Sequence, residues 1–162
     1  PNFAALANKI YQKTGWTGVV CGGPSEESLG KAILKRTNTP LQNWIGQTTL
    51  LQLIAVIAGA KFLIANETSA VHIAAAVSVP AVCILGGGHF ARFMPYQVDD
   101  GIDRPEPLPV FNKMECFGCK WRCVHKSSSK NAVPCICKIS VDDVWNALSV
   151  ILKARYAITT SS

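Results

Sequence analysis

Apolar residues recur at helical spacing in several stretches of the chain, with polar residues at the positions between them. Residues 2–14 place five apolar side chains on one helical face before Gly15 ends the pattern: Phe3, Leu6, Ala7, Ile10 and Tyr11. The same spacing predicts helices over residues 50–58, 69–77 and 140–157.

Capping patterns mark the starts of three helices. A cap side chain accepts hydrogen bonds from the first backbone N–H groups of a helix. Two pairs have the spacing of such a cap: Thr49 with Gln52, and Ser140 with Asp143. Ser25 is expected to cap a further helix over 25–36, with two acids in its first turn, where the helix dipole favours them.

Short β-rich runs lie between these helices, over residues 17–21, 61–65 and 80–85. Strands that alternate with helices predict an α/β fold with a parallel sheet and helices on its faces. Ligands bind such sheets at the carboxyl ends of the strands. Gly-rich or polar loops follow the three strands, at 22–26, 66–69 and 86–92, and we expect these loops to gather at one edge of the sheet.

Residues 89–139 differ from the rest because they are rich in Pro and Cys and poor in periodicity. We interpret them as a long excursion from a single domain over residues 1–162, with the helix 140–157 returning to the sheet. The chain starts at Pro1 without an initiator Met, so we expect it to be part of a longer protein.

Composition and charge narrow the classes of protein. The 162 residues are 49% hydrophobic and 16% charged, which suits a folded domain and not a disordered chain. The longest apolar stretches are shorter than the roughly 20 residues of a membrane span.

Residues 1–112 carry eight Lys or Arg and seven Asp or Glu, whereas residues 113–155 carry eight Lys or Arg and three Asp or Glu. The basic stretch suits an anionic membrane surface or glycan, and a solvated surface explains it equally well. It lacks the aromatic-interleaved basic motif of RNA-binding domains, so we expect no nucleic-acid partner.

Four polar residues, Asn66 to Ser69, lie where the strand 61–65 meets the helix 69–77. The first N–H groups of that helix carry a partial positive charge and suit an anion such as phosphate. Thr68 can cap the helix, and His72 lies one turn further on the same side. Glu67 suits a sugar or ribose hydroxyl. Plain helix capping explains the same residues, and this alternative stays open.

These residues resemble the signature of glycosyltransferase family 9, the ADP-heptose:lipopolysaccharide heptosyltransferases and their relatives. That signature reads roughly Asn-Asp-Thr-Gly-x-x-His, followed by three alanines and a proline. The chain matches it at Asn66, Thr68 and His72, and then at Ala74–Ala76 and Pro80. The chain departs from the signature at two positions. Glu67 replaces Asp and reaches one methylene further, and Ser69 replaces Gly and adds a small side chain near a bound phosphate.

Further segments resemble family motifs in the same order along nearly the whole chain. Gly22–Glu26 is similar to the family's Gly-Gly-x-x-Glu loop. Gly46–Leu50 is similar to its Gly-Lys-Thr-Ser-Leu segment, with Gln47 in place of a frequent Lys. Leu85–Gly87, taken with Pro95 and Tyr96, resembles the family's Phe-Gly-x-Thr…Gly-Pro-Tyr loop. The family's Cys-x-x-Cys cluster is resembled by Cys116, Cys119, Cys123 and Cys135.

The resemblance implies the GT-B architecture, in which two Rossmann-like domains face each other across a cleft. This chain resembles only the second, C-terminal half, which binds the nucleotide sugar through a Rossmann-like parallel sheet with helices on both faces. The N-terminal acceptor domain, with the expected general-base carboxylate, is absent from the chain. We therefore expect no catalytic residue in it, and no activity of this chain alone.

An ADP-sugar, with ADP-heptose as the first choice, is the donor that the resemblance implies. Glu26 would hold the ribose hydroxyls, Thr48 and Thr49 would lie by the base, and the helix start would bind the diphosphate. His72 is expected to help binding and not catalysis. The implied substrate-binding residues are Gly22, Gly23, Glu26, Thr48, Thr49, Glu67, Thr68, Ser69, His72, Gly86 and Gly87.

The implied reaction is an inverting transfer of a heptosyl or hexosyl group to a lipopolysaccharide-core or related glycan acceptor. Backbone dipoles at the helix start would stabilise the charge on the leaving diphosphate, so no metal and no other cofactor is expected. The implied partners are the donor, the acceptor glycan and the N-terminal domain of the same enzyme. The implied location is cytoplasmic, with peripheral contact at the inner membrane left open.

The chain contains seven cysteines, and two of them, Cys21 and Cys83, are expected to be small buried residues of strands. The others are Cys116, Cys119, Cys123, Cys135 and Cys137, for which zinc, disulfides and free thiols all stay open. Two alternative functions stay open with them. One is a non-catalytic nucleotide- or glycan-binding module of the same fold, and the other is a metal-binding or redox module built on the clustered cysteines.

Overall fold

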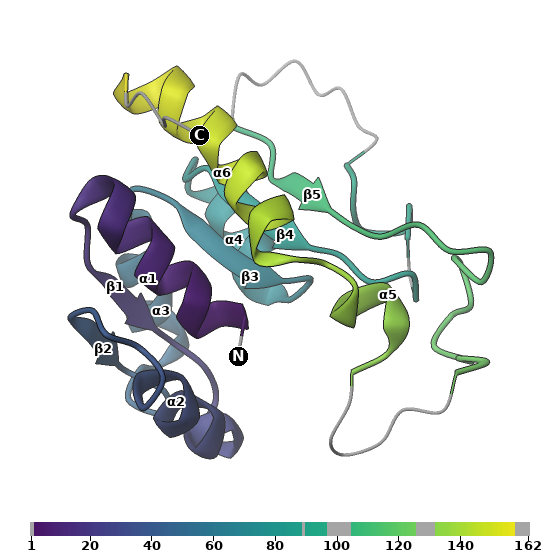
Figure 1. The fold of residues 1–162 in the computed structure, drawn as a ribbon, viewed down its shortest axis with the longest axis horizontal. Helices are drawn as coiled ribbons and strands as arrows, with labels where there is room; N and C mark the ends of the chain where they lie inside the picture. The colour runs from purple at the N-terminus through teal and green to yellow at the C-terminus, as the bar shows by residue number, and fades with distance from the viewer. Residues whose placement is uncertain (1, 89, 97–104, 126–131, 158–162) are drawn as a thin grey trace. The chain divides into compact units, whose positions relative to one another are not determined.

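A computed structural model of the chain describes residues 2–88, 90–96, 105–125 and 132–157. Its helices and strands alternate along most of the chain (Figure 1). In chain order they are α1 (Asn2–Thr14), β1 (Gly18–Val20), the 3-10 helix η1 (Pro24–Glu26), α2 (Glu27–Leu34), β2 (Leu41–Asn43), α3 (Leu50–Ala58), β3 (Leu63–Asn66), α4 (Ser69–Ala76), β4 (Ala81–Ile84), β5 (Leu108–Val110), α5 (Pro134–Cys137) and α6 (Val141–Tyr156).

The chain divides into two compact units, and each is described by itself. One unit comprises Pro1–Val56 with Ser149–Ser162, and the other comprises Ile57–Leu148. In the first unit, β1 and β2 form a parallel pair in which Val19 lies opposite Gln42. The helix α2 packs against β2. The prediction of one nucleotide-sugar-binding domain over 1–162 stays a prediction.

The unit Ile57–Leu148 is built on a three-stranded sheet in the order β3, β4, β5, and all of its strands are parallel (Figure 1). The helix α4 packs against β3 and β4. The register pairs Asn66, the last residue of β3, with Ile84, the last residue of β4. The loops that follow these two strands therefore start at the same edge of the sheet, as the sequence predicts for this pair.

Parallel pairing is confirmed for every paired strand, but the sequence pattern missed two strands and one short helix of the described residues. The strand β2 and the helix α5 have only three and four residues, too few to show a period. The strand β5 contains Pro109, and proline lacks the N–H group that a central strand needs. In the described sheet β5 is an edge strand, where proline is tolerated.

Two of the four expected helix caps form, those at Thr49 and Ser140. The Thr49 N–H and hydroxyl lie 2.8 and 3.0 Å from Gln52 Oε1, and the Gln52 N–H donates to Thr49 Oγ1. Ser140 and Asp143 form the same reciprocal pair at the start of α6. The prediction that Ser25 caps a helix is wrong, because the chain turns into η1 at Pro24 and Glu26 is the residue before α2.

Fully buried apolar side chains gather in the unit Ile57–Leu148 around the sheet. One cluster joins Val71 of α4, Cys83 of β4, and Leu85 and Met94 of the segment that follows β4. In the other unit, Ala4 and Leu6 of α1 are buried, whereas Phe3 and Tyr11, at the ends of the predicted apolar face, are exposed.

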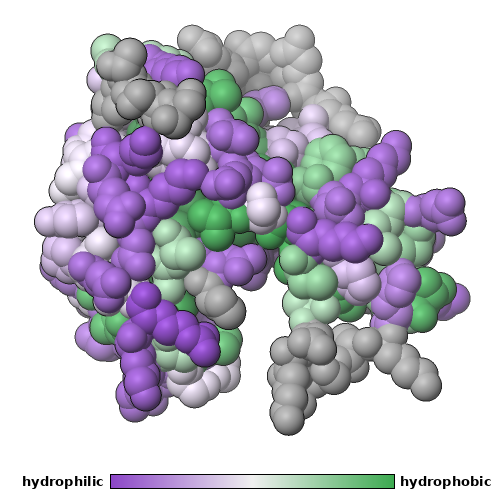
Figure 2. All heavy atoms as spheres, viewed as in Figure 1, coloured by the Kyte–Doolittle hydropathy of each residue, from purple (hydrophilic) through white to green (hydrophobic). Residues whose placement is uncertain are grey.

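Hydrophilic side chains cover most of the face shown in Figure 2, and hydrophobic ones appear in smaller patches between them. Within the described residues, no helix is both long enough and apolar enough to cross a membrane.

Removing side-chain volume from the cluster around β4 should destabilise the fold. Leu85 is fully buried, so Leu85→Ala should lower the free energy of unfolding by about 2–5 kcal/mol through lost burial and a residual cavity. Leu51 is 78% exposed, and Leu51→Ala should change stability by less than about 0.5 kcal/mol. Urea denaturation followed by circular dichroism measures both, and equal effects would contradict the assigned core.

The cap of α6 makes a pH-dependent contribution to stability. The Ser140 backbone N–H and hydroxyl hold the pKa of Asp143 below its ordinary value. A carboxyl group with a lowered folded-state pKa stabilises the fold above its unfolded pKa of about 3.9, and loses this effect as the pH falls through the folded value.

Asp143→Asn should therefore lower the free energy of unfolding at pH 7 by up to about 1 kcal/mol, a cap-sized effect limited by solvent exposure. The difference from the unaltered chain should shrink below pH 4. Asp142→Asn is the matched control, since both acids lie in the first turn of α6. An equal, pH-independent loss in both variants would show that the cap does not stabilise the helix.

Candidate functional site

The turn between β3 and α4 has the geometry that the sequence predicts. Asn66 ends β3, Thr68 has an extended backbone at the N-cap, and α4 begins at Ser69. The Thr68 hydroxyl makes no capping hydrogen bond, contrary to the expected role of its side chain. Thr68 and Ser69 are exposed, so a ligand can reach the start of this helix.

Glu67 is held at the edge of the sheet by its backbone. Its N–H donates to the Ile84 carbonyl oxygen at 3.1 Å, which extends the pairing of the two strands by one residue.

Burial, and then the charge of Glu67, raise the pKa of the Cys83 thiol to about 12. Cys83 is thus protonated at neutral pH and is a buried strand residue, as the sequence predicts.

Cys21 differs from Cys83, because it follows β1 and is only half-buried. Burial raises the pKa of its thiol too. The prediction that Cys21 is a buried residue within a strand is therefore wrong.

A hydrogen bond joins His72 of α4 to the segment after β4. The Nδ1 atom of His72 lies 2.7 Å from the Tyr96 hydroxyl oxygen, and the ring centroids are 5.8 Å apart. Tyr96 also packs against the buried cluster around β4. Tyr96 is not among the site residues that the sequence predicts, although Pro95 and Tyr96 belong to a segment that resembles a family motif.

Gly86, Gly87 and Gly88 are buried against the Cys-rich segment that follows β5. A Cβ atom at Gly87 would lie 2.6 Å from the ring of Phe117, and one at Gly88 would lie 2.6 Å from the indole of Trp121. Packing within the protein therefore requires glycine at both positions. Close approach of a ligand to Gly86 and Gly87 stays a prediction, and Phe117 and Trp121 are neighbours of this loop that the sequence did not indicate.

The loop after β1, in the other unit, is closed by Glu26. One carboxylate oxygen, Oε2, accepts a hydrogen bond from the Gly23 N–H at 2.9 Å. The Gly46 N–H donates to the Gly22 carbonyl oxygen, and Gly46 has the left-handed φ of +71° that favours glycine. The acid that the resemblance places near the ribose is thus exposed and already ordered by its own loop.

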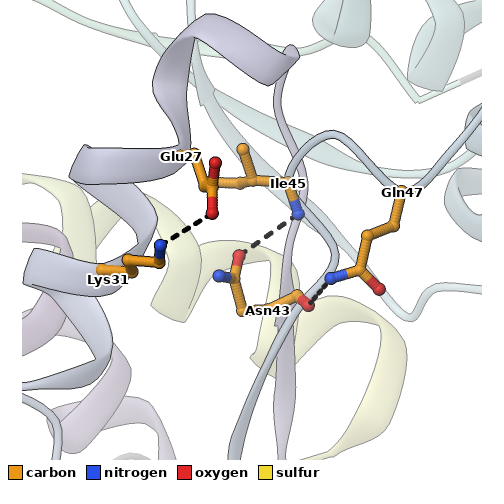
Figure 3. A network of polar contacts seen from close by, with 5 residues as sticks. All are labelled: Glu27, Lys31, Asn43, Ile45 and Gln47. Carbon is orange, nitrogen blue, oxygen red and sulfur yellow. Dashed lines mark hydrogen bonds and ion pairs between the residues drawn. The ribbon is translucent and has the colours of Figure 1, made fainter.

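The segment after β2 is shaped by side chains that bond to nearby backbone (Figure 3). Gln47 Nε2 donates to the Asn43 carbonyl oxygen at 2.9 Å, and the Ile45 N–H donates to Asn43 Oδ1 at 3.2 Å. Gln47 therefore folds back on its own loop at the position where the family often has Lys. Thr48 is half-buried, and the Thr49 hydroxyl takes part in the cap of α3.

The expected site residues are divided between the two units of the chain. Glu67, Thr68, Ser69, His72, Gly86 and Gly87 belong to the unit Ile57–Leu148, and Gly22, Gly23, Glu26, Thr48 and Thr49 belong to the other. That all three loops meet at one site stays a prediction.

Cysteine and histidine positions define no metal centre in the part of the chain that the structure describes. All seven cysteines are free thiols there, and no three His, Cys, Asp or Glu side chains form a group that could hold a metal ion. His125 lies outside helices and strands, and His89 lies outside the described residues.

Comparison with known families decides the identity of this α/β fold. The model of glycosyltransferase family 9 (heptosyltransferase) matches residues 1–119 of the 162. The chain belongs to glycosyltransferase family 9. This range contains all eleven residues that the sequence proposed for substrate binding.

Among its relatives in family 9 are two proteins named lipopolysaccharide heptosyltransferase 2. The one from Escherichia coli is 32% identical over 89 residues, and the one from Salmonella typhimurium is 30% identical over 89 residues. Each match covers 52% of this chain and 25% of the relative. The matched part of the chain therefore spans only about a quarter of the length of these relatives.

Solved structures of the family share the fold. A family 9 glycosyl transferase from Veillonella parvula aligns with a TM-score of 0.72 and 21% identity, over 94% of this chain and 41% of that chain. The E. coli ADP-heptose lps heptosyltransferase II aligns with a TM-score of 0.70 and 20% identity, over 95% and 42%. These alignments confirm the expected α/β fold with parallel strands.

The contact between His72 and Tyr96 should appear as an energetic coupling. Each of Tyr96→Phe and His72→Leu removes one partner of the hydrogen bond, and such a bond contributes about 0.5–1.5 kcal/mol. Unfolding free energies of the two single variants and the double variant should give a coupling energy in that range. Additive effects would show that the two side chains do not interact in solution.

Proposed function

We propose that this chain is the nucleotide-sugar-binding part of a family 9 glycosyltransferase, with ADP-heptose as the donor. The match of the family model over residues 1–119 carries the proposal, because it covers every residue assigned to the donor site. The names of the relatives support the heptosyl group. The general base belongs to a part of the enzyme outside this chain.

The start of α4 is the proposed diphosphate site. Its first N–H groups have no partner within the helix and carry partial positive charge. The Thr68 hydroxyl makes no cap bond and is exposed, so it is available to donate to a phosphate oxygen. A short side chain at Ser69 leaves the backbone open to the ligand.

The same feature supports a chemical role in transfer. When the acceptor hydroxyl attacks the anomeric carbon, the bond to the leaving diphosphate breaks and negative charge builds on its oxygens. Backbone dipoles that are already oriented stabilise such charge without reorganisation. We therefore propose an inverting transfer that does not require a divalent cation.

The nucleoside is assigned to the loops of the other unit. The Glu26 carboxylate is exposed beside the Gly23 N–H, and its second oxygen, Oε1, suits a ribose hydroxyl. Thr48 and Thr49 are assigned to the base. The proposed acceptor is a lipopolysaccharide-core glycan or a related one. The proposed site of action is the cytoplasmic face of the inner membrane, and the proposed protein partner is the rest of the enzyme.

Calorimetric titration with ADP, ADP-heptose and UDP tests this function. The chain should bind the two adenine nucleotides in preference to UDP. Glu26→Ala should weaken ADP binding about tenfold or more, since a hydrogen bond to a charged group contributes roughly 1.5–3 kcal/mol.

Two further variants make the titration specific. Glu26→Gln keeps an acceptor for the Gly23 N–H but loses the charge, so it separates loop order from contact with the ribose. Glu27→Ala is the matched control, because Glu27 pairs with Lys31 on the exposed side of α2 at 2.7 Å (Figure 3). Equal affinity for UDP, or equal losses in the Glu26 and Glu27 variants, would contradict the proposed site.

A further inference from the structure

Trp121 lies on the glycine loop that follows β4. A Cβ atom at Gly88 would be 2.6 Å from both Cδ2 and Cε2 of the indole, and one at Gly86 would be 3.9 Å from its Cη2 atom. The indole therefore rests directly on the backbone of this loop. Because only glycine leaves room for it, the ring and the loop are matched in shape.

Two hydrogen bonds hold the segment around Trp121 in place. The Gly118 N–H donates to the Gly87 carbonyl oxygen at 2.7 Å, and the Lys120 N–H donates to the Gly88 carbonyl oxygen at 2.8 Å. The ring of Phe117 fills the space beside Gly87. The segment that carries Trp121 is thus fixed to the end of β4.

The backbone at Trp121 has an unfavourable conformation. Lys120 and Trp121 both have left-handed φ values, of 50° and 63°. Such values are unfavourable for L-residues with side chains of this size, and residues held in them cluster at functional sites. Glycine would adopt the same turn without this cost. We therefore expect the side chains of Lys120 and Trp121 to have a role that glycine could not fill.

Trp121 as a whole residue is 59% exposed, even though its indole contacts the glycine loop. Lys120 and Arg122 flank it and are exposed as well. No acid occurs in the segment 116–125, so the surroundings of the ring in the sequence are basic. An exposed aromatic residue with a cation before it and another after it in the sequence suits a ligand that combines a flat or apolar face with a negative charge.

Such a ligand has a natural place at this position. The glycine loop starts at the carboxyl end of β4, and ligands of parallel α/β sheets bind at that edge. We propose that Trp121, with Lys120 and Arg122, forms a stacking platform for a phosphate-bearing sugar. The ring takes the C–H face of the sugar, and the two cations take the phosphate.

The choice of sugar rests on the proposed function, and two sources have this chemistry. One is the sugar of the nucleotide-diphosphate donor, and the other is a phosphorylated glycan acceptor. The platform itself follows from the packing of Trp121 and does not depend on which of them binds.

Titrations of the unaltered chain and of Trp121→Ala with three probes test the platform: ADP, ADP-heptose, and a phosphorylated core oligosaccharide released from lipopolysaccharide. Loss of a stacking ring should weaken binding of one sugar probe about five- to tenfold, a typical effect for removing an aromatic platform. Binding of ADP, which has no transferable sugar, should change less than twofold. A loss for ADP-heptose identifies the donor as the ligand, and a loss for the oligosaccharide identifies the acceptor.

Variants separate stacking from folding. Trp121→Phe keeps a ring and should retain most of the affinity, whereas the double variant Lys120→Gln, Arg122→Gln keeps the ring and should reduce both the affinity and its dependence on salt. Val124→Ala is the control within the same segment, because Val124 is 75% exposed and has no ring or charge. Thermal unfolding of each variant shows whether the fold is intact.

The results distinguish the two proposals. If ADP and both sugar probes bind equally to the unaltered chain and to the Trp121 and Lys120/Arg122 variants, the platform is wrong and the donor function stands. If only the oligosaccharide binds and Trp121→Ala weakens it, the platform stands and the donor function fails. If neither sugar probe binds the unaltered chain, the platform is overturned, and the ADP titration alone decides the donor function.

Discussion

The parallel pairing of β3 with β4 is the constraint on which the candidate site in residues 57–148 depends. The register that places Asn66 opposite Ile84 brings the ends of both strands to one edge of the sheet. The bond from the Glu67 N–H to the Ile84 carbonyl carries this order into the turn. As a result, the start of α4 and the glycine loop leave the sheet side by side. A strand offset by one residue would turn every side chain to the opposite face, so the site and the core share one requirement.

The glycine loop links that edge to the segment after β5. Glycines in such loops are usually explained by close approach of a phosphate or by a tight turn. Here the space that side chains would take is filled from within the protein by Phe117 and Trp121. The Cys-rich segment therefore packs against this edge of the sheet through Phe117 and Trp121.

Contacts at the start of α4 show how one unit combines packing with a site. His72 is held by Tyr96, whose ring packs against the buried cluster of Val71, Cys83, Leu85 and Met94. The charge of Glu67 acts on Cys83 in the neighbouring strand. Side chains that the family signature groups by sequence are thus positioned by residues that lie outside the signature.

Local chemistry let the sequence by itself determine the long helices, the two reciprocal caps and the order of the three main strands. Apolar periodicity over eight or more residues, and pairs such as Thr49 with Gln52, act within a few residues and can be read without the fold. The family resemblance likewise rests on contiguous motifs. Only the tertiary structure decided that Leu108–Val110 is an edge strand, that Tyr96 holds His72, and that Trp121 covers Gly88. Each of these joins segments more than twenty residues apart, and such contacts depend on how the sheet and its loops pack, which local patterns do not encode.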